Sequence, residues 1–355
     1  MDDNSFDVIV IGGGAAGLSG ALTLARARRS VLVLDAGEPR NAPAAGVHGF
    51  LTRDGIAPAE LVERGAEEVI RYGGTMLRAR AVTARRTDGS EGTGFVVGTE
   101  DGREFAARRL LVTTGLVDEL PDVPGLRERW GRDVLHCPYC HGWEVRDQPL
   151  GVLATGPQAV HQALLLRQWS PRVTLFRHTA PDPGDEQRER LAARDIAVVD
   201  GQVTALEVTD DELTGVRLAS GRVLPLRALA VLPRMVARAG VVTDLGLASV
   251  EHPRGVGSQL ESDVSGRTPV EGVWVAGNAA DVAATVVTAA AGGVTAAAAI
   301  NADLVEEDTR RAVARRRDRL TPFSATAEAR VAELVLGARR HGITPSAPTR
   351  PSPLL

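Results

Sequence analysis

The 355-residue sequence contains no lysine, so arginine supplies all 41 of its basic side chains. This absence excludes Schiff-base catalysis by lysine and a phosphate-binding loop of the lysine-containing type. Aromatic residues make up only 3% of the chain, and the formal net charge is −4. A chain with this charge balance is not expected to bind nucleic acid or an acidic membrane surface.

Long hydrophobic runs are also scarce. The first one, residues 8–11, is too short for a signal-peptide core or a membrane span, and the alanine-rich segment near residue 290 consists of small side chains. We therefore expect a cytoplasmic protein without a membrane partner. The length of the chain predicts two domains, each large enough to bury a core.

Only two cysteines occur, Cys137 and Cys140, and both lie in the hexapeptide His-Cys-Pro-Tyr-Cys-His. A spacing of two residues lets the sulfur atoms form a disulfide across the first turn of a helix, where backbone N–H groups stabilise a thiolate. Pro138 has no N–H to donate and suits that first turn. His136 and His141 flank the pair and are candidates for the proton transfers that thiol exchange requires.

Other interpretations of this motif compete with redox chemistry. A structural zinc site needs four ligands and normally a second cysteine pair, which the chain lacks. Cys-x-x-Cys-His is also the attachment pattern of c-type haem, but that use requires export. Two unreactive cysteines that happen to be close form the third alternative. In the cytoplasm structural disulfides are rare, so we favour a redox-active pair and expect no metal.

The N-terminus carries a nucleotide-binding pattern. Residues 6–11 are predicted to form a buried strand, which leads into Gly12-x-Gly14-x-x-Gly17 and a helix with one apolar face. This glycine spacing permits a tight turn, close approach to a pyrophosphate and close packing of helix on strand. A second predicted strand, residues 30–34, ends in Asp35, which can accept ribose hydroxyls. The sequence therefore predicts a dinucleotide site here.

The middle of the chain predicts a second unit of the same kind. It follows an antiparallel meander over residues 79–105, a strand at 109–112 and a linker at 118–125. Strands at 150–154 and 172–176 flank a helix at 159–168. The turn between strand and helix begins with alanine where the first glycine is expected, and no acidic residue follows the second strand. We therefore expect this unit to bind a nicotinamide nucleotide poorly.

The last third is predicted to contain a strand at 272–278 and a helix of small residues at 286–305, in which Gly292 and Gly293 permit close backbone approach. Six arginines at 310–319 follow three acidic residues, so a solvated helical face is favoured over a nucleic-acid patch. Ser324 is a candidate cap for a final helix ending at Gly342, whose apolar stripe needs a partner surface. Residues 343–355 are expected to be disordered.

The order of these motifs resembles the low-molecular-weight thioredoxin reductase family over residues 5–305. The resemblance implies an α/β, two-domain Rossmann-like flavoprotein, in which an inserted nucleotide-binding-like domain splits the FAD-binding domain. On that pattern, residues 1–118 and 240–308 bind FAD, residues 119–239 form the insert with the cysteines, and residues 309–355 form a helical extension and tail. The family also implies a homodimer.

The resemblance further implies roles for individual residues. Cys140 would face the isoalloxazine ring and Cys137 would meet the substrate, with His141, and then His136, as the acid or base. The residues expected to hold FAD come from several short segments. They are Gly12, Gly14, Ala15, Ala16, Gly17, Asp35, Ala36, Arg40, Asn41, His48, Val82, Thr114, Gly115, Gly277 and Asn278.

Three departures from the thioredoxin reductase pattern bear on the direction of the reaction. His141 replaces an aspartate after the second cysteine, Asn278 replaces an aspartate after Gly277, and Arg177-His178-Thr179 replaces the arginine-rich NADPH motif. The loop with Arg40-Asn41 and His48-Gly49-Phe50, and the run Cys-Pro-Tyr-Cys-His-Gly-Trp-Glu from residue 137, look like the FAD-dependent dithiol oxidases of gliotoxin and holomycin biosynthesis.

That branch implies a function: closure of a disulfide in a small-molecule dithiol, with oxygen reduced to hydrogen peroxide. Two alternatives stay open at this point. One is an NAD(P)H-dependent disulfide reductase that acts on a thioredoxin-like protein. The other is a non-enzymatic redox sensor built from the flavin and the cysteines.

Overall fold

The computed structural model describes residues 4–87, 94–320 and 325–336. The chain divides into two compact units, residues 1–301 and 302–355. Within the first unit, the boundaries of the FAD-binding and inserted domains stay predictions.

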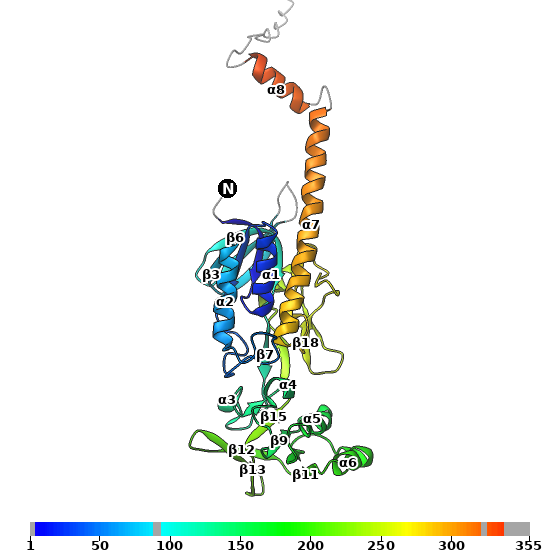
Figure 1. Cartoon of the computed structure of the whole chain (residues 1–355). Coiled ribbons are helices and arrows are strands. Elements are labelled where there is room, and N and C mark those ends of the chain that lie inside the picture. The colour runs from blue at the N-terminus through cyan, green and yellow to red at the C-terminus, as the bar shows by residue number, and fades with distance from the viewer. Residues whose placement is uncertain (1–3, 88–93, 321–324, 337–355) are drawn as a thin grey trace, which may run out of the picture. The chain divides into compact units, whose positions relative to one another are not determined.

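A seven-stranded sheet forms around the buried strand β1 (Ser5–Ile11), in the order β3-β2-β1-β6-β5-β4, and β19 also pairs with β6 (Figure 1). The other strands of this first sheet are β2 (Val31–Asp35), β3 (Thr75–Arg78), β4 (Ala81–Thr87), β5 (Gly94–Thr99), β6 (Glu104–Val112) and β19 (Val273–Val275). Antiparallel pairing of β4, β5 and β6 confirms the predicted meander. The chain leaves this sheet after β6. After 160 intervening residues it returns as β19, which pairs with β6 in parallel.

Helix α1 (Ala15–Arg26) lies beside the part of α7 (Val286–Leu320) that belongs to the first unit (Figure 1), and α2 (Pro58–Arg71) contacts α1. A Cβ on Gly293 would lie 2.0 Å from the carbonyl oxygen of Ala16, so only glycine allows this approach. The close contact predicted at this glycine pair is thus confirmed for Gly293. By length and composition α7 could also cross a membrane, but Ala296, Ala297 and Ile300 are fully buried, which is typical of a core helix.

The second sheet is parallel throughout, in the order β11-β10-β9-β15-β8. Its strands are β8 (Val134–Leu135), β9 (Leu150–Leu153), β10 (Val173–Phe176), β11 (Ala197–Val199) and β15 (Ala228–Val231). Helix α5 (Gln158–Leu166) connects β9 to β10, and α6 (Gly184–Ala192) connects β10 to β11. The predicted second strand-helix-strand unit is confirmed, whereas α6 and β11 are absent from the sequence prediction.

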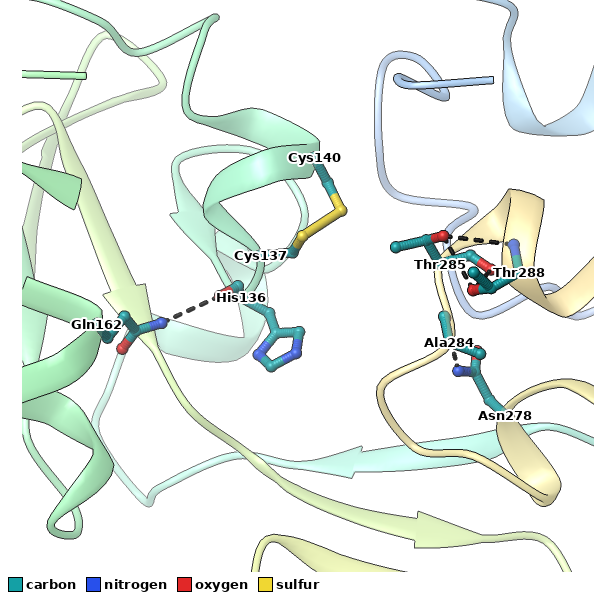
Figure 2. Close-up of a disulfide and its surroundings, with 8 residues drawn as sticks. All are labelled: His136, Cys137, Cys140, Gln162, Asn278, Ala284, Thr285 and Thr288. Atoms are coloured by element: carbon teal, nitrogen blue, oxygen red, sulfur yellow. Dashed lines mark hydrogen bonds between the residues drawn. A yellow bond between two sulfur atoms is a disulfide. The ribbon is translucent and has the colours of Figure 1, made fainter. Parts of the chain in front are cut away.

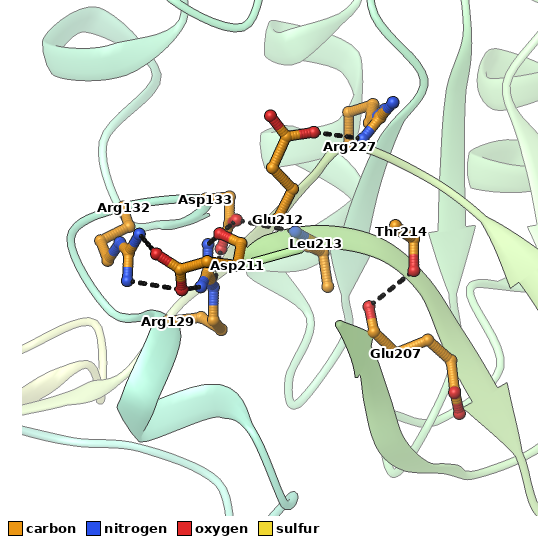
Figure 3. A network of polar contacts seen from close by, with 9 residues as sticks. All are labelled: Arg129, Arg132, Asp133, Glu207, Asp211, Glu212, Leu213, Thr214 and Arg227. Carbon is orange, nitrogen blue, oxygen red and sulfur yellow. Dashed lines mark hydrogen bonds and ion pairs between the residues drawn. The ribbon is translucent and has the colours of Figure 1, made fainter. Parts of the chain in front are cut away.

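An antiparallel meander of β12 (Val203–Thr209), β13 (Glu212–Leu218) and β14 (Val223–Pro225) accompanies the second sheet. Arg129, at the end of the short helix α3 (Leu126–Arg129), fixes its first hairpin (Figure 3). Its buried guanidinium pairs with Asp133 and donates to Oδ1 of Asp211 at 2.6 Å. Asp133 also accepts the N–H of Leu213, so one buried arginine joins α3 to the hairpin turn.

A four-stranded sheet carries the chain out of the first sheet and back. It contains β7 (Leu116–Glu119), β16 (Arg234–Ala237), β17 (Ser249–Glu251) and β18 (Gly257–Leu260), and the short helices η1 (Gly240–Leu245) and η2 (Gly277–Ala279) follow β16 and β19. The expected linker at 118–125 is therefore wrong at its start. Asp118 and Glu119 belong to β7, because the returning strand β16, from a distant part of the chain, pairs with them.

In the second unit, α7 continues to Leu320 and α8 spans Ala325–Leu336. Glu306 pairs with Arg310 and Glu307 with Arg311, each one helical turn apart, which confirms the predicted solvated face. Ser324, Gly342 and the expected disordered tail lie outside the described residues. Val331, Leu334 and Val335 of α8 are exposed, and a partner surface for them stays a prediction.

Candidate functional site

A cavity of about 830 Å³ lies in the first unit and brings distant segments together. The glycine turn after β1, the segment after β2, the start of α2, the end of β6, the cysteine segment and the start of α7 all line it. The residues of the predicted site that line this cavity are Gly12, Gly14, Ala15, Ala16, Asp35, Ala36, Arg40, Asn41, His48, Thr114, Gly115, His136, Cys137, Cys140, His141, Gly277 and Asn278.

The three glycines of the Gly12-x-Gly14-x-x-Gly17 turn have different structural roles. Gly12 has φ of +110°, and a Cβ there would lie 2.4 Å from the carbonyl oxygen of Thr113. A Cβ on Gly17 would lie 1.9 Å from the carbonyl oxygen of Gly12. Gly14, in contrast, has no protein atom within 4 Å of the position a Cβ would take, although it lines the cavity. Gly12 and Gly17 thus permit packing, while Gly14 leaves room for a ligand.

The residues around this turn fit the phosphates and ribose of a dinucleotide. Gly14 is the N-cap of α1 and has no side chain to cap the first N–H groups, so these remain available to an anion. Asp35 accepts the N–H of Gly13 through Oδ1 at 3.0 Å. Its other carboxylate oxygen is therefore free of that bond and suits a ribose hydroxyl.

The two cysteines form a disulfide in the wall of the same cavity, with Cα atoms 5.3 Å apart. Cys137 caps the four-residue helix α4 (Pro138–His141), as the spacing predicts. Figure 2 shows the disulfide facing the start of α7, where Thr285 and Thr288 lie. Asn278 donates through Nδ2 to the carbonyl oxygen of Ala284 at 2.9 Å and so fixes the turn that presents Thr285.

The two histidines beside the cysteines have different electrostatic surroundings. Burial, reinforced by the Arg40 guanidinium, lowers the pKa of His136 to about 4, so its imidazole is neutral at physiological pH. Its buried Nδ1 has no hydrogen-bond partner within the described protein. Burial also lowers the pKa of His141, and the nearby Glu144 carboxylate opposes that shift. His141 is therefore the better placed of the two to exchange protons near neutral pH.

Arg40 and His48, both expected to hold the cofactor, contact acidic side chains. The Arg40 guanidinium forms two hydrogen bonds with the Asp118 carboxylate, at 2.7 and 2.8 Å. His48 lies 3.5 Å from Asp54 on one side of its ring and 3.5 Å from Glu144 on the other. Both residues line the cavity, but each is tied to another segment of the chain.

Two predicted cofactor residues do not line the cavity. Gly17 acts through the close packing just described. Val82 lies on β4 with its side chain 43% exposed.

Residues at one end of the second strand-helix-strand segment, β9-α5-β10, contact other parts of the first unit. Arg177, after β10, donates to Asp200 at 2.6 Å, and His178 accepts the N–H of Val203 through Nδ1. At the start of α5, Gln158 donates to the carbonyl oxygen of Arg254, which lies in the turn between β17 and β18. Arg177, His178 and Gln158 thus each have a partner within the chain.

Several cavity residues were not predicted from the sequence. Glu63, Asp118, Trp130, Arg238 and Thr285 all line the cavity. A signal existed only for Thr285, which directly precedes the helix of small residues. The other four lie on segments that tertiary structure alone brings to the site.

The chain matches the family model described as pyridine nucleotide-disulphide oxidoreductase over residues 6–293. The thioredoxin reductase sirT of Leptosphaeria maculans is 30% identical over 78% of this chain and 87% of its own length. The thioredoxin reductase tcpT of Claviceps purpurea is 38% identical over 49% of this chain. For tcpT and one further curated relative, the alignment spans only 56% and 38% of their length.

The crystal structure of HlmI is similar with a TM-score of 0.84 and 47% identity, over 90% of this chain and 99% of that chain. These matches and the fold imply a flavin cofactor and a disulfide-dependent redox role. The chain belongs to the pyridine nucleotide-disulphide oxidoreductase family, in its thioredoxin reductase-like branch.

Proposed function

We propose that this protein is an FAD-dependent dithiol oxidase that closes an intramolecular disulfide in a small-molecule natural product and reduces oxygen to hydrogen peroxide. One observation carries the proposal: the Cys137–Cys140 disulfide shares a cavity with the glycine turn, while Arg177 and Gln158 of the second strand-helix-strand segment contact Asp200 and Arg254 of the chain itself. On this proposal, electrons enter through the disulfide and not from a nicotinamide nucleotide.

The cysteine pair performs the thiol chemistry. A substrate thiolate attacks Sγ of Cys137, breaks the Cys137–Cys140 bond and expels the thiolate of Cys140. The second substrate thiol then displaces Cys137 from the mixed disulfide. The cyclic disulfide product leaves, and two electrons remain on the enzyme as the dithiol of Cys137 and Cys140.

The other residues bind the cofactor and move protons. Bound FAD would take the two electrons from the dithiol and pass them to oxygen. The first turn of α1, with Gly14 and Asp35, would hold its pyrophosphate and ribose. His141 takes the protons of the attacking thiols, because burial keeps its imidazole neutral near physiological pH. Neutral His136 contributes less as a base, since its pKa is about 4.

The stoichiometry of the reaction tests the proposal. With the dithiol form of gliotoxin as probe, we expect one oxygen consumed and one peroxide formed per disulfide closed, without any nucleotide. Cys137→Ser and Cys140→Ser should both abolish oxygen uptake, whereas Ser220→Ala, an exposed change outside the cavity, should not. Oxygen uptake that requires NADPH would overturn the proposal.

The reductase alternative retains one observation in its favour. The second parallel sheet is complete, with β9, α5 and β10 in the arrangement that binds nucleotides, and relatives are named thioredoxin reductases. If the Gln158 contact opened to admit NADPH, the electrons would run from nucleotide to disulfide. The direction depends on the difference between the potentials of the two couples, of which about 30 mV corresponds to 1.4 kcal/mol for two electrons.

The cellular setting belongs to the same proposal. We expect a cytoplasmic homodimer whose partners are the small dithiol and oxygen. Sedimentation of the purified protein distinguishes a dimer from a monomer.

A further inference from the structure

The part of α7 that belongs to the second unit presents mostly exposed side chains. Leu304 is fully buried, but every side chain from 305 to 317 is half-buried or exposed. The family model ends at residue 293, so this segment lies outside the matched residues. Helices in proteins gain most of their stability from the packing of one face. A partner on one face of this segment would therefore stabilise it.

Small and apolar side chains gather on one face of the segment. The residues along this face are Val305, Asp308, Thr309, Ala312, Val313 and Arg316. Their spacing of three or four residues is that of one side of an α-helix. Val305 is 50% exposed and Val313 is 41% exposed. Ala312 lies between them and Arg316, and its small side chain permits another helix to approach closely.

Charge is divided along the same segment. Four acidic residues lie within 303–308, and five arginines lie within 310–317. Glu306 pairs with Arg310 and Glu307 with Arg311 inside the helix, and the arginines at 315–317 follow these pairs. A second copy of the segment in parallel orientation would bring like charges together. In antiparallel orientation, the acidic end of each copy lies beside the basic end of the other.

We propose that a second copy of this chain packs antiparallel on this face of α7, with the Ala312 residues of both copies at the crossing point. Two-fold symmetry about that point places Asp308 opposite Arg316 of the second copy, because each lies four residues from Ala312. Thr309 and Val313 of each copy pack around the two alanines. The inference goes beyond the proposed function, since it assigns a contact surface far along the chain from the disulfide and the glycine turn.

Two other occupants complement this face less well. Helix α8 has exposed apolar side chains, but its charged residues Glu328, Arg330 and Glu333 alternate in sign along the helix. They do not complement a face with one acidic and one basic end. A nucleic acid would attract the arginines at 310–317 but would be repelled by the acidic residues at 303–308.

Disulfide cross-linking between copies tests the crossing point. Helix axes packed at about 10 Å, with Cα atoms about 2.3 Å from each axis, bring facing Cα atoms to about 5 Å, which a disulfide can span. The full-length Ala312→Cys protein is oxidised with diamide at micromolar concentration and run on a non-reducing gel. We expect more than about half of its chains to run as cross-linked pairs.

Ala314→Cys is the matched control. Ala314 is also exposed, but it is turned about 200° around the helix axis from Ala312. This variant and the wild type, whose two cysteines are already joined to each other, should give less than about one tenth of cross-linked chains.

Charge exchange tests the orientation of the second copy. In the Ala312→Cys protein, the further change Arg316→Asp places two carboxylates opposite each other and should lower the cross-linked fraction about threefold or more. Adding Asp308→Arg to that protein exchanges the two charges and should restore the fraction. An unchanged fraction in Arg316→Asp, or no recovery with Asp308→Arg, would overturn the antiparallel arrangement.

The cross-linking result itself can also overturn the proposal. Equal cross-linking of Ala312→Cys and Ala314→Cys, or none of Ala312→Cys, would do so. In the second case, a dimer in sedimentation would place the contacts between copies elsewhere, and a monomer would leave the face to α8. None of these measurements requires flavin or a dithiol substrate, so a failure of the oxidase proposal is recognised separately.

Discussion

Gly14→Ala should weaken flavin binding and Gly17→Ala should destabilise the fold, although the two glycines belong to one motif. A Cβ at position 17 would lie 1.9 Å from the carbonyl oxygen of Gly12, where ordinary contact begins at 3.4 Å. Backbone cannot yield as a flexible side chain does. We expect Gly17→Ala to destabilise the fold by about 3 kcal/mol, the upper end of overpacking costs.

Gly14→Ala should leave the fold nearly unchanged. Gly14 has φ of −79° and ψ of −173°, which alanine adopts without strain, and no protein atom lies within 4 Å of the new Cβ. The methyl group instead takes space at the first turn of α1, where a phosphate would approach the N–H groups. Loss of one or two hydrogen bonds to a charged group corresponds to about 10- to 100-fold weaker flavin binding.

Two measurements separate these outcomes. Flavin released by heating is quantified per chain, and the melting temperature is measured on flavin-free protein. Gly14→Ala should lose flavin and keep its melting temperature within about 2 °C, whereas Gly17→Ala should melt about 6–12 °C lower. A Gly14→Ala protein with as much flavin per chain as the wild type, or a Gly17→Ala protein with the wild-type melting temperature, would refute the roles assigned to these glycines.

Two further predictions concern stability and pH. Arg129→Met leaves Asp133 without its buried partner and should lower the free energy of unfolding by about 3 kcal/mol in urea titrations. Arg132→Met, which removes an exposed pair, should cost no more than about 1 kcal/mol, and equal losses would contradict the role of burial. The rate of flavin reduction by dithiol should fall only below pH 6.5, because burial lowers the pKa of His141 and its imidazole acts when neutral. His141→Gln should slow this step about 100-fold and abolish that acid limb, and an acid limb above pH 6.5 would argue against His141 as the base.

Local patterns were enough to predict the parts of the site that depend on chain spacing. The glycine turn, Asp35 and the disulfide follow from residues that are neighbours along the chain, and the structure finds each of them in its expected element. The second strand-helix-strand unit was likewise evident from its apolar segments. Close packing at Gly293 followed from the lack of a side chain.

Contacts between distant segments were beyond such reasoning. Nothing near Asp118 indicates a strand, because its partner β16 lies more than a hundred residues later. His48 was assigned to the cofactor from its motif, whereas its two carboxylate contacts depend on how loops 48–54 and 141–144 meet. The Gln158–Arg254 contact could not be foreseen either, since it joins α5 to a turn of another sheet.

The direction of electron flow is the central claim, and anaerobic reduction of the flavin tests it most directly. The holoenzyme is mixed with the dithiol form of gliotoxin in one experiment and with NADPH in another, and the visible absorbance of the flavin is followed. We predict rapid bleaching by the dithiol alone, with colour and peroxide appearing when air is admitted. Rapid bleaching by NADPH would contradict the account and identify a reductase.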